Sequence, residues 1–229
     1  MKKRLLRIAI AVLIGLALLT GAILGLIHTL GDHEALYEAK PVYFWIVQLT
    51  NQDLTASNHA TLVLNENIIP RLTNVMFQDT NDSRLRIALI DKLNTLPHVN
   101  IYYTTASTRR GEAATTLGDL GPPARAAAPS LMLALKGKDL ILRRAAAVAL
   151  GKIHAEPEVM IPLLITYLDD QNMDEAAADG LGEYGTSAKA ALPKLISLST
   201  VRDKDLRHAV REALMKIDPE AAAQARKPQ

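Results

Sequence analysis

Apolar positions recur at a fixed interval along the C-terminal half of the chain. The recurring position is a leucine at four sites, Leu117, Leu150, Leu181 and Leu214, with intervals of 33, 31 and 33 residues. The segments around them are similar to one another and read "RRGEAATTLGDLG", "LRRAAAVALGKI", "MDEAAADGLGEYG" and "LRHAVREALMKI". Self-similarity at this period indicates stacked structural repeats. Each of these segments is predicted to be the first helix of a repeat.

A second column predicts where the other helix of each repeat begins. Prolines stand twelve residues after three of the leucines, at Pro129, Pro162 and Pro193, and the runs "SLMLAL", "LLITYL" and "KLISLS" follow them. Proline is tolerated in the first turn of a helix because its missing N–H would have no partner there. Each repeat is therefore predicted to be a helical hairpin whose second helix starts at the proline.

Small residues predict how the hairpins pack. Glycine directly follows the leucine at Gly118, Gly151 and Gly182, and alanines precede it. Short side chains permit short distances between helix axes, so we expect the first helices of successive repeats to lie close together. A single hairpin buries too little surface to be stable, whereas a stack builds a continuous core. The sequence thus predicts an all-α fold of the α-solenoid type.

Charged residues keep the same register. Arginines lie seven residues before the leucine at Arg110, Arg143 and Arg207, and aspartates precede two of them by four residues at Asp139 and Asp203. Counting from Leu93 adds Arg86 and Asp82. Such an aspartate can cap the next helix, and the arginine can bond across the turn or to the adjacent repeat. We expect a ladder along one edge of the stack. A row of arginines that binds an anionic ligand is the alternative.

Residues 8–30 contain no formally charged side chain. A helix of this length measures about 35 Å and can cross a hydrocarbon core of about 30 Å. The prediction is an N-terminal membrane anchor over residues 1–30, with a cleaved signal peptide as the alternative. The basic residues before it, Lys2, Lys3, Arg4 and Arg7, predict a cytoplasmic N-terminus and an extracytoplasmic repeat domain, periplasmic in a bacterium with an outer membrane. Ala17, Gly21 and Gly25 form a small-residue face that would permit weak self-association.

Two regions separate the anchor from the array. Residues 31–57 are predicted to be a juxtamembrane linker whose aromatic segment "KPVYFWIVQLTN" forms a capping helix or rests in the membrane interface. Residues 58–107 are predicted to be a divergent repeat, with a helix beginning at Pro70 and an irregular insertion near its end. Loops that interrupt an array often carry function. Tyr102 and Tyr103 are therefore candidate contacts for a partner, unless they cover a hairpin end.

Composition narrows the classes of function. The formal net charge is +2, and because the four basic residues at the N-terminus contribute +4, residues 8–229 carry −2. A nearly neutral body predicts no binding to nucleic acid. The chain has no cysteine, which excludes disulfides and thiol chemistry. The six histidines are scattered without metal-ligand spacing, so no catalytic, cofactor-binding or metal-binding residue is predicted.

The segment around Leu181 departs most from the consensus. Asp174 replaces the arginine of the other repeats while Asp170 remains, and Asp169 and Glu175 add further negative charge. These four residues are a candidate docking patch for a basic partner. The alternative is an ordinary solvated surface.

These columns resemble the HEAT-repeat family, in particular its short HEAT-like type found in phycobilin lyases. The match is to R-x-x-A-A-x-A-L-G-x-I/L followed by A-x-x-A-x-P-x-L, and it covers residues 108–219, about half of the chain. Residues 108–229 are assigned to the array. The resemblance implies a right-handed superhelix that recognises proteins, and the lack of cysteine argues against lyase chemistry. We expect a membrane-tethered scaffold or adaptor that binds a protein along the ridge of second helices at 130–135, 163–168 and 194–199. The alternatives are an accessory or catalytic subunit of an enzyme system with a ligand pocket in its concave face, and a purely structural anchor.

Overall fold

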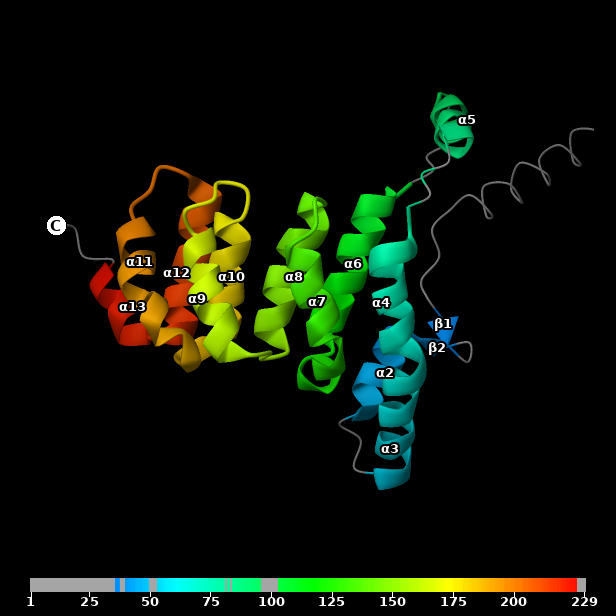
Figure 1. Cartoon of the computed structure of the whole chain (residues 1–229), viewed down its shortest axis with the longest axis horizontal. Coiled ribbons are helices and arrows are strands. Elements are labelled where there is room, and N and C mark those ends of the chain that lie inside the picture. Colours follow the sequence, from blue (N-terminus) through cyan, green and yellow to red (C-terminus); the bar gives the residue numbers. More distant parts are fainter. Residues whose placement is uncertain are drawn as a thin grey trace, which may run out of the picture. The chain divides into compact units, whose positions relative to one another are not determined.

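The computed structural model describes residues 36–37, 40–49, 53–80, 82, 84–95 and 103–225. These residues are helical, apart from connecting segments and one antiparallel pair of two-residue strands, β1 (Leu36–Tyr37) and β2 (Lys40–Pro41). The predicted all-α fold is confirmed, and Figure 1 shows the helices of residues 106–225 side by side in a stack.

The chain divides into two compact units. One includes residues 81–105, with the helix α5 (Arg84–Asn94), and the other comprises residues 35–80 and 106–229. The second unit begins with α2 (Val42–Leu49), α3 (Leu54–Val63), the π-helical segment η1 (Leu64–Ile68) and α4 (Ile69–Gln78). The assignment of α5 to one repeat with the helices before it stays a prediction.

The repeats occupy the rest of the second unit. Their elements are α6 (Ala106–Asp119), the 3₁₀ segment η2 (Pro122–Ala127), α7 (Ala128–Leu135), α8 (Leu140–Lys152), α9 (Pro157–Tyr167), α10 (Asp174–Glu183), the 3₁₀ segment η3 (Gly185–Ala191), α11 (Leu192–Leu198), α12 (Lys204–Ile217) and α13 (Pro219–Ala225).

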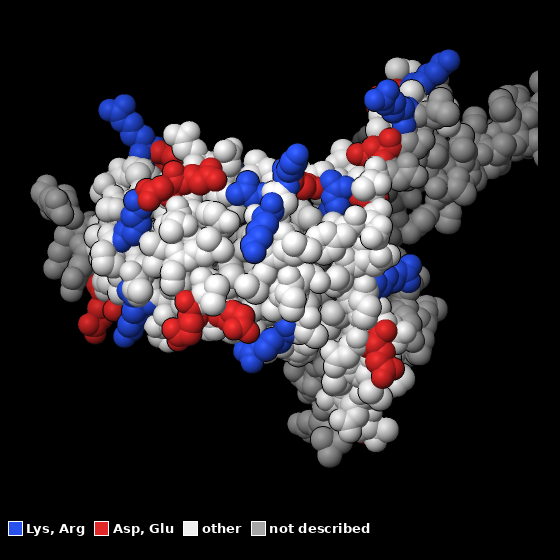
Figure 2. Space-filling model, in the orientation of Figure 1, with Lys and Arg blue, Asp and Glu red and all other residues white. Residues whose placement is uncertain are grey.

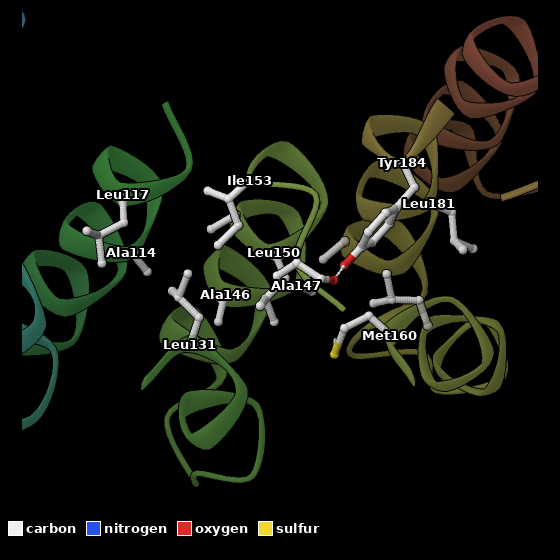
Figure 3. Close-up of a cluster of buried hydrophobic side chains, with 14 of the residues drawn as sticks. Ala114, Leu117, Leu131, Ala146, Ala147, Leu150, Ile153, Met160, Leu181 and Tyr184 are labelled. Carbon is white, nitrogen blue, oxygen red and sulfur yellow. Dashed lines mark hydrogen bonds between the residues drawn. The ribbon is translucent and has the colours of Figure 1, made fainter. Parts of the chain in front are cut away.

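The first helices of the repeats, α6, α8, α10 and α12, form one continuous layer in which each helix packs against the next. The four recurring leucines, Leu117, Leu150, Leu181 and Leu214, are all buried. Figure 3 shows three of them in the same interior as Leu131 of α7 and Met160 of α9. The recurring column therefore marks the centre of the core.

Glycine brings these first helices together. A Cβ atom added at Gly118 would lie 2.8 Å from the Cα of Ala149, and one added at Gly182 would lie 3.0 Å from the Cα of Ala213. Between α8 and α10 the contact is closer still, because a Cβ at Gly151 would lie 2.4 Å from the carbonyl oxygen of Gly180. A side chain at Gly118 or Gly151 would force the helices apart, and one at Gly182 would be tight, so the predicted close approach of first helices is confirmed.

The second helices follow the proline column in two of three repeats. Pro129 and Pro193 lie at the second residue of α7 and α11, as predicted. The prediction for Pro162 is wrong, because α9 begins five residues earlier at Pro157 and Pro162 lies inside the helix. Pro157 takes the helix-starting role there, since proline is equally tolerated at the first position. Inside α9, Pro162 has no N–H to donate to the Glu158 carbonyl.

The helix that includes Pro70 is continuous with the one before it. Although α4 begins at Ile69, the backbone is right-handed helical from α3 through η1 into α4. Within η1 the Ile69 N–H bonds to the Leu64 carbonyl, five residues back. Proline lacks an N–H and crowds the preceding turn, and a π turn accommodates this by widening the helix locally. Pro70 thus widens a long helix here and does not separate two helices.

The N-terminal helices share the core of the array. Trp45 of α2 is buried, and its ring meets the rings of Phe44 and His59 edge to face, with centroid distances of 5.2 and 5.5 Å. At the other end of this segment, α4 packs against α6. The role of residues 31–57 as a cap stays a prediction.

Among the described residues, no helix has both the length and the hydrophobicity needed to cross a membrane. The predicted anchor at residues 1–30, including Ala17, Gly21 and Gly25, lies outside the described part of the chain.

Candidate functional site

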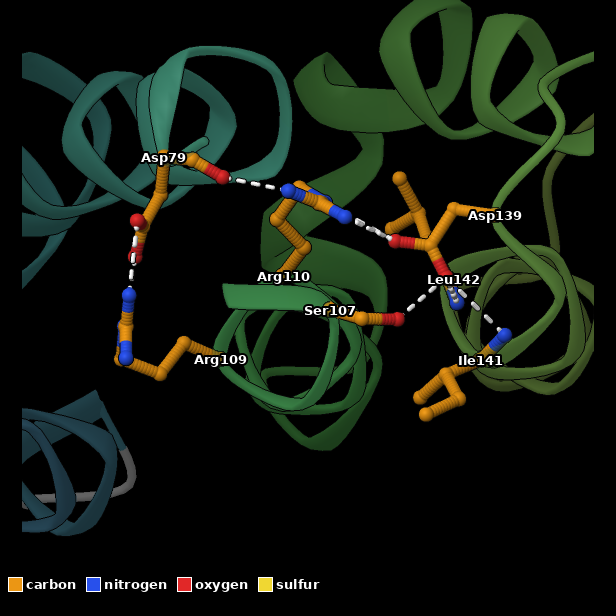
Figure 4. Close-up of polar contacts among 7 residues, drawn as sticks. All are labelled: Asp79, Ser107, Arg109, Arg110, Asp139, Ile141 and Leu142. Atoms are coloured by element: carbon orange, nitrogen blue, oxygen red, sulfur yellow. Dashed lines mark hydrogen bonds and ion pairs between the residues drawn. The ribbon is translucent and has the colours of Figure 1, made fainter. Parts of the chain in front are cut away.

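The charged ladder predicted along one edge is present. Arg110 of α6 donates from its Nε, at 2.9 Å, to the carboxylate of Asp139, which begins the next repeat. The same guanidinium donates backward to the backbone carbonyl of Asp79 at the end of α4. Arg109 beside it pairs with the Asp79 carboxylate (Figure 4). One arginine side chain therefore joins three successive layers of the array.

Asp139 also caps α8. Its carboxylate accepts from the backbone N–H groups of Ile141 and Leu142 at 3.1 and 3.3 Å, and from the Ser107 hydroxyl at 2.6 Å. Burial by itself would raise the pKa of Asp139, but the hydrogen bonds from Ser107, Arg110 and the Leu142 amide outweigh burial and lower it. The carboxylate is thus held in its charged form, and the arginine row is structural at this rung.

The equivalent arginines further along the array are less tightly paired with aspartates. Arg143 donates to the Leu135 carbonyl at 3.2 Å and lies 3.9 Å from Asp170. Within the described residues, Arg207 donates only to backbone carbonyls of the loop before α12, at 2.6 Å to Val201. Asp203 in the same loop caps α12. The side chain of Arg86, the remaining arginine of the column, lies outside the described part of the structure.

The predicted acidic patch comes together at the turn from α9 to α10, but much of its charge is already matched within the protein. Asp169 pairs with Lys194 of α11, and Glu175 lies 3.8 Å from Arg144 of α8. Asp170 accepts from the backbone N–H of Asn172 at 2.9 Å and faces Arg143, while Asp174 accepts from the Glu175 amide at 2.7 Å. Docking of a basic partner here stays a prediction.

The predicted tyrosine contacts lie in the unit that contains α5. The Tyr103 hydroxyl donates to the carboxylate of Asp82 at 2.6 Å, and its side chain is half-buried. Tyr102 lies outside the described residues. For Tyr103 the bond to Asp82 supplies a structural role, and contact with a partner is untested.

A groove that sequence reasoning missed lies between the C-terminal ends of α4 and α7. It is open to solvent and has a volume of about 470 Å³. Its apolar wall is formed by Met76, Phe77, Leu133, Ala134 and Leu142, and its polar rim by Thr80, Arg110, Lys136, Lys138 and Asp139. Phe77 and Leu133 are 37% and 59% exposed, although both are large apolar side chains. The groove is therefore a place where the array leaves apolar surface uncovered.

The rim of this groove is basic. Arg110 is balanced by Asp139 across a short ion pair, whereas the ammonium groups of Lys136 and Lys138 have no hydrogen-bond or ion-pair partner among the described residues. In Figure 2, Lys and Arg side chains predominate along the upper edge over the middle of the array, with acidic side chains among them, and a larger acidic cluster lies along that edge over α10 and α12. The groove thus combines exposed apolar side chains with uncompensated positive charge.

Within the described residues, no three or more His, Asp or Glu side chains are grouped to hold a metal ion. The ring of His154 lies 6.1 Å from that of the buried Tyr184 in an edge-to-face contact.

Comparison with protein-family models and with curated proteins gives no match for this chain.

Proposed function

We propose that this protein is a HEAT-like scaffold that binds another protein through the surface of its helical array and performs no catalysis of its own. The observation that carries the proposal is the groove between α4 and α7, where the exposed side chains of Phe77 and Leu133 face one hollow. Contiguous apolar surface left open on a folded protein typically marks an interaction site. A stack with closely fitting layers presents such a surface in a fixed shape, which limits the entropy lost on binding.

The HEAT assignment is part of this proposal. It is supported by the repeat period, by the first helices that approach through glycine, and by the arginine and aspartate column that links neighbouring repeats. The right-handed superhelix follows from the resemblance and belongs to the proposal as well.

We also propose that residues 8–30 tether the array to a membrane, with the N-terminus in the cytoplasm and the repeats on the other side. The uncharged segment and the basic residues before it support this orientation. A tether confines the array to the membrane surface and so raises its local concentration near membrane-bound partners. An enzyme subunit, the alternative, would be expected to have converging polar groups in an enclosed pocket, whereas this groove is open and mostly apolar along its wall.

Site-specific photo-crosslinking of the full chain in its native membranes tests the proposal. A photoreactive amino acid is placed in turn at Leu133 in the groove, at Asp174 in the acidic patch, and at Thr166 and Ile196 on the ridge of second helices. The exposed Leu62 of α3 serves as the matched control. We expect a discrete protein adduct at Leu133 that is absent at Leu62. The scaffold proposal fails when none of the four array positions gives an adduct beyond that control.

A further inference from the structure

We infer that the groove between α4 and α7 takes an acidic peptide segment of a partner protein, anchored by a large apolar side chain. This inference rests on the proposed scaffold function and specifies the chemistry of its partner. Three features of the groove carry it: its apolar wall, its unmatched lysines and its concave shape.

The apolar wall of the groove favours a ligand with a large apolar side chain. Phe77 and Leu133 flank the hollow, and Met76, Ala134 and Leu142 lie buried behind them. The core is already close-packed behind this wall, so these side chains can lose further contact with water only when a ligand covers them. A volume of about 470 Å³ lies within the range of about 300–1,000 Å³ typical of pockets that hold drug-sized groups. A few side chains from one face of a short helix or strand would fill it.

The unmatched lysines call for negative charge beside that anchor. Lys136 and Lys138 flank Gly137 in the turn between α7 and α8, and both are exposed. The rim carries one carboxylate, that of Asp139, and Arg110 already pairs with it. The two ammonium groups therefore leave a local positive field, which favours an acidic ligand and disfavours a basic one.

Shape distinguishes a peptide from the two other anionic partners. A bilayer surface is flat on this scale, so lipid headgroups would meet the lysines but would not fill the hollow beside Leu133. A nucleic acid would need a row of cations along its backbone, whereas residues 8–229 carry a formal net charge of −2. A peptide with both acidic and apolar side chains can contact the lysines of the rim and cover the apolar wall at the same time.

Selection from a random twelve-residue peptide library tests the inference, with the full chain held in nanodiscs of zwitterionic lipid. We expect the enriched peptides to combine Asp or Glu with Leu, Phe or Trp. They should bind wild type more weakly as salt rises, because the rim lysines are exposed to solvent. Leu133→Asp, and separately the pair Lys136→Glu and Lys138→Glu, should weaken binding about tenfold or more.

The matched control places the same changes on α3 and η3, as Leu62→Asp with Lys189→Glu, where both residues are exposed. This variant should bind like wild type. Because Leu133 and both lysines are exposed, all variants should keep the wild-type circular dichroism spectrum and melting temperature, and that check separates lost binding from lost folding.

The inference is overturned when no peptide is enriched, when the enriched peptides are basic, or when they bind the groove variants as well as wild type. It is also overturned when vesicles of phosphatidylglycerol, used as a second probe, bind in a groove-dependent way and the peptides do not. A persistent crosslink at Asp174, Thr166 or Ile196 in any of these cases would leave the scaffold function standing and remove only this groove's ligand.

Discussion

The first helices of the repeats pack in a uniform way, whereas the connections and second helices differ from one repeat to the next. Between first helices, every interface uses the same solution, a glycine set against the backbone of the neighbouring helix at Gly118, Gly151 and Gly182. The connections vary from one repeat to the next. The repeat is therefore defined by the first helices, and the other layer is free to diverge.

The hairpins α6–α7 and α8–α9 show how far the connections diverge. After α6 the chain turns at Gly121, whose φ is +66°, and passes through η2 before α7 begins. After α8 the equivalent position is His154, with φ +50°, and Glu156 also has a positive φ, of +38°. Side chains other than glycine are disfavoured in such conformations. The α8–α9 connection must therefore be held by contacts elsewhere.

Those contacts come from the adjacent repeats. The hydroxyl of the buried Tyr184, directly after the first helix of the next repeat, donates to the Ala155 carbonyl. From the preceding repeat, Arg125 donates to the His154 carbonyl at 3.1 Å. Variation in the second layer is thus tolerated where neighbouring repeats supply the missing hydrogen bonds. The groove proposed to bind a partner also lies at the second layer, where α7 meets α4.

The largest expected loss of stability in the layer of first helices comes from Gly151→Ala. Alanine normally stabilises a helix relative to glycine by about 1 kcal/mol, but here the new Cβ would meet the Gly180 carbonyl at 2.4 Å. We expect a loss of about 3 kcal/mol in the free energy of unfolding, seen as a lower melting temperature by circular dichroism.

Gly111→Ala is the matched control for Gly151→Ala. Its new Cβ would lie 2.7 Å from the Cγ2 methyl of Ile141 and no nearer than 3.5 Å to backbone, and the exposed Ile141 side chain can rotate about χ1. We expect a change of no more than about 1 kcal/mol. Equal losses in the two variants would contradict the view that backbone contact sets the cost.

In the connection layer, Gly121→Ala should have the next largest effect. Gly121 combines φ +66° with ψ −150°, a region essentially restricted to glycine, so we expect a loss of about 2 kcal/mol. A Cβ at this position would meet no atom within 4 Å, and the loss would therefore report backbone strain alone. Thermal unfolding beside wild type measures it, and an unchanged melting temperature would refute the prediction.

Tyr184→Phe tests the support given to the α8–α9 connection. It leaves the Ala155 carbonyl without its donor, and we expect a loss of about 1–2 kcal/mol at neutral pH. His154 and its neighbours should also become more accessible to hydrogen exchange. A loss spread evenly over the array would argue against this local role.

The same tyrosine predicts an alkaline instability. Burial raises the pKa of Tyr184, and the nearby Glu156 carboxylate adds to the shift. The folded protein therefore retains this proton at a pH where the unfolded chain, with an ordinary tyrosine pKa of about 10, has lost it. The contribution of Tyr184 to stability should be complete below that pH and decline as the pH rises above it. Chemical unfolding across this range should show a smaller decline in Tyr184→Phe.

The smallest expected effect is a gain. His154→Gly places glycine where Gly121 and Gly185 stand in the neighbouring repeats and removes the strain of φ +50°. We expect up to about 1 kcal/mol of added stability, less the lost ring contact with Tyr184. His154→Ala loses the ring and keeps the strain, so it should be less stable than His154→Gly. The reverse order would show that the ring contact outweighs the backbone.

The sequence predicted the first layer well because its signals are local and repeated. Leu117, Gly118 and Arg110 each stand in a column, so packing, close approach and the ladder could all be inferred from spacing. The start of α9 was mispredicted because Pro157 and Pro162 are both compatible with a helix start. The left-handed turn at His154 has counterparts at Gly121 and Gly185 and so does not distinguish the repeats, but among the described residues only this connection has a second left-handed residue, Glu156, directly before Pro157.

The groove could not be predicted from the repeat pattern. Leu133 lies in an apolar run that resembles its buried neighbours, and Phe77 comes from the divergent repeat that precedes the array. Only the packing of α4 beside the array brings the two together. The lysines Lys136 and Lys138 gave a visible local charge, but nothing in the sequence indicated the apolar wall beside them.

The arginines of the ladder differ in how strongly they link neighbouring repeats, and this difference predicts which end of the array unfolds first. Arg110 of α6 bonds both to the end of α4 and to the start of α8. Separating α4 from the array therefore breaks a hydrogen bond of a guanidinium that also holds α8. Arg207 donates to carbonyls of the loop before its own helix. Among the described residues, removing the last hairpin therefore breaks no arginine bond between repeats, and it is opposed by the packing of α12 on the preceding repeat and by the Lys216–Glu183 ion pair. A steady pull on both ends should therefore open the stack from its C-terminal hairpin, one layer at a time, and release the α4–α6–α8 block last.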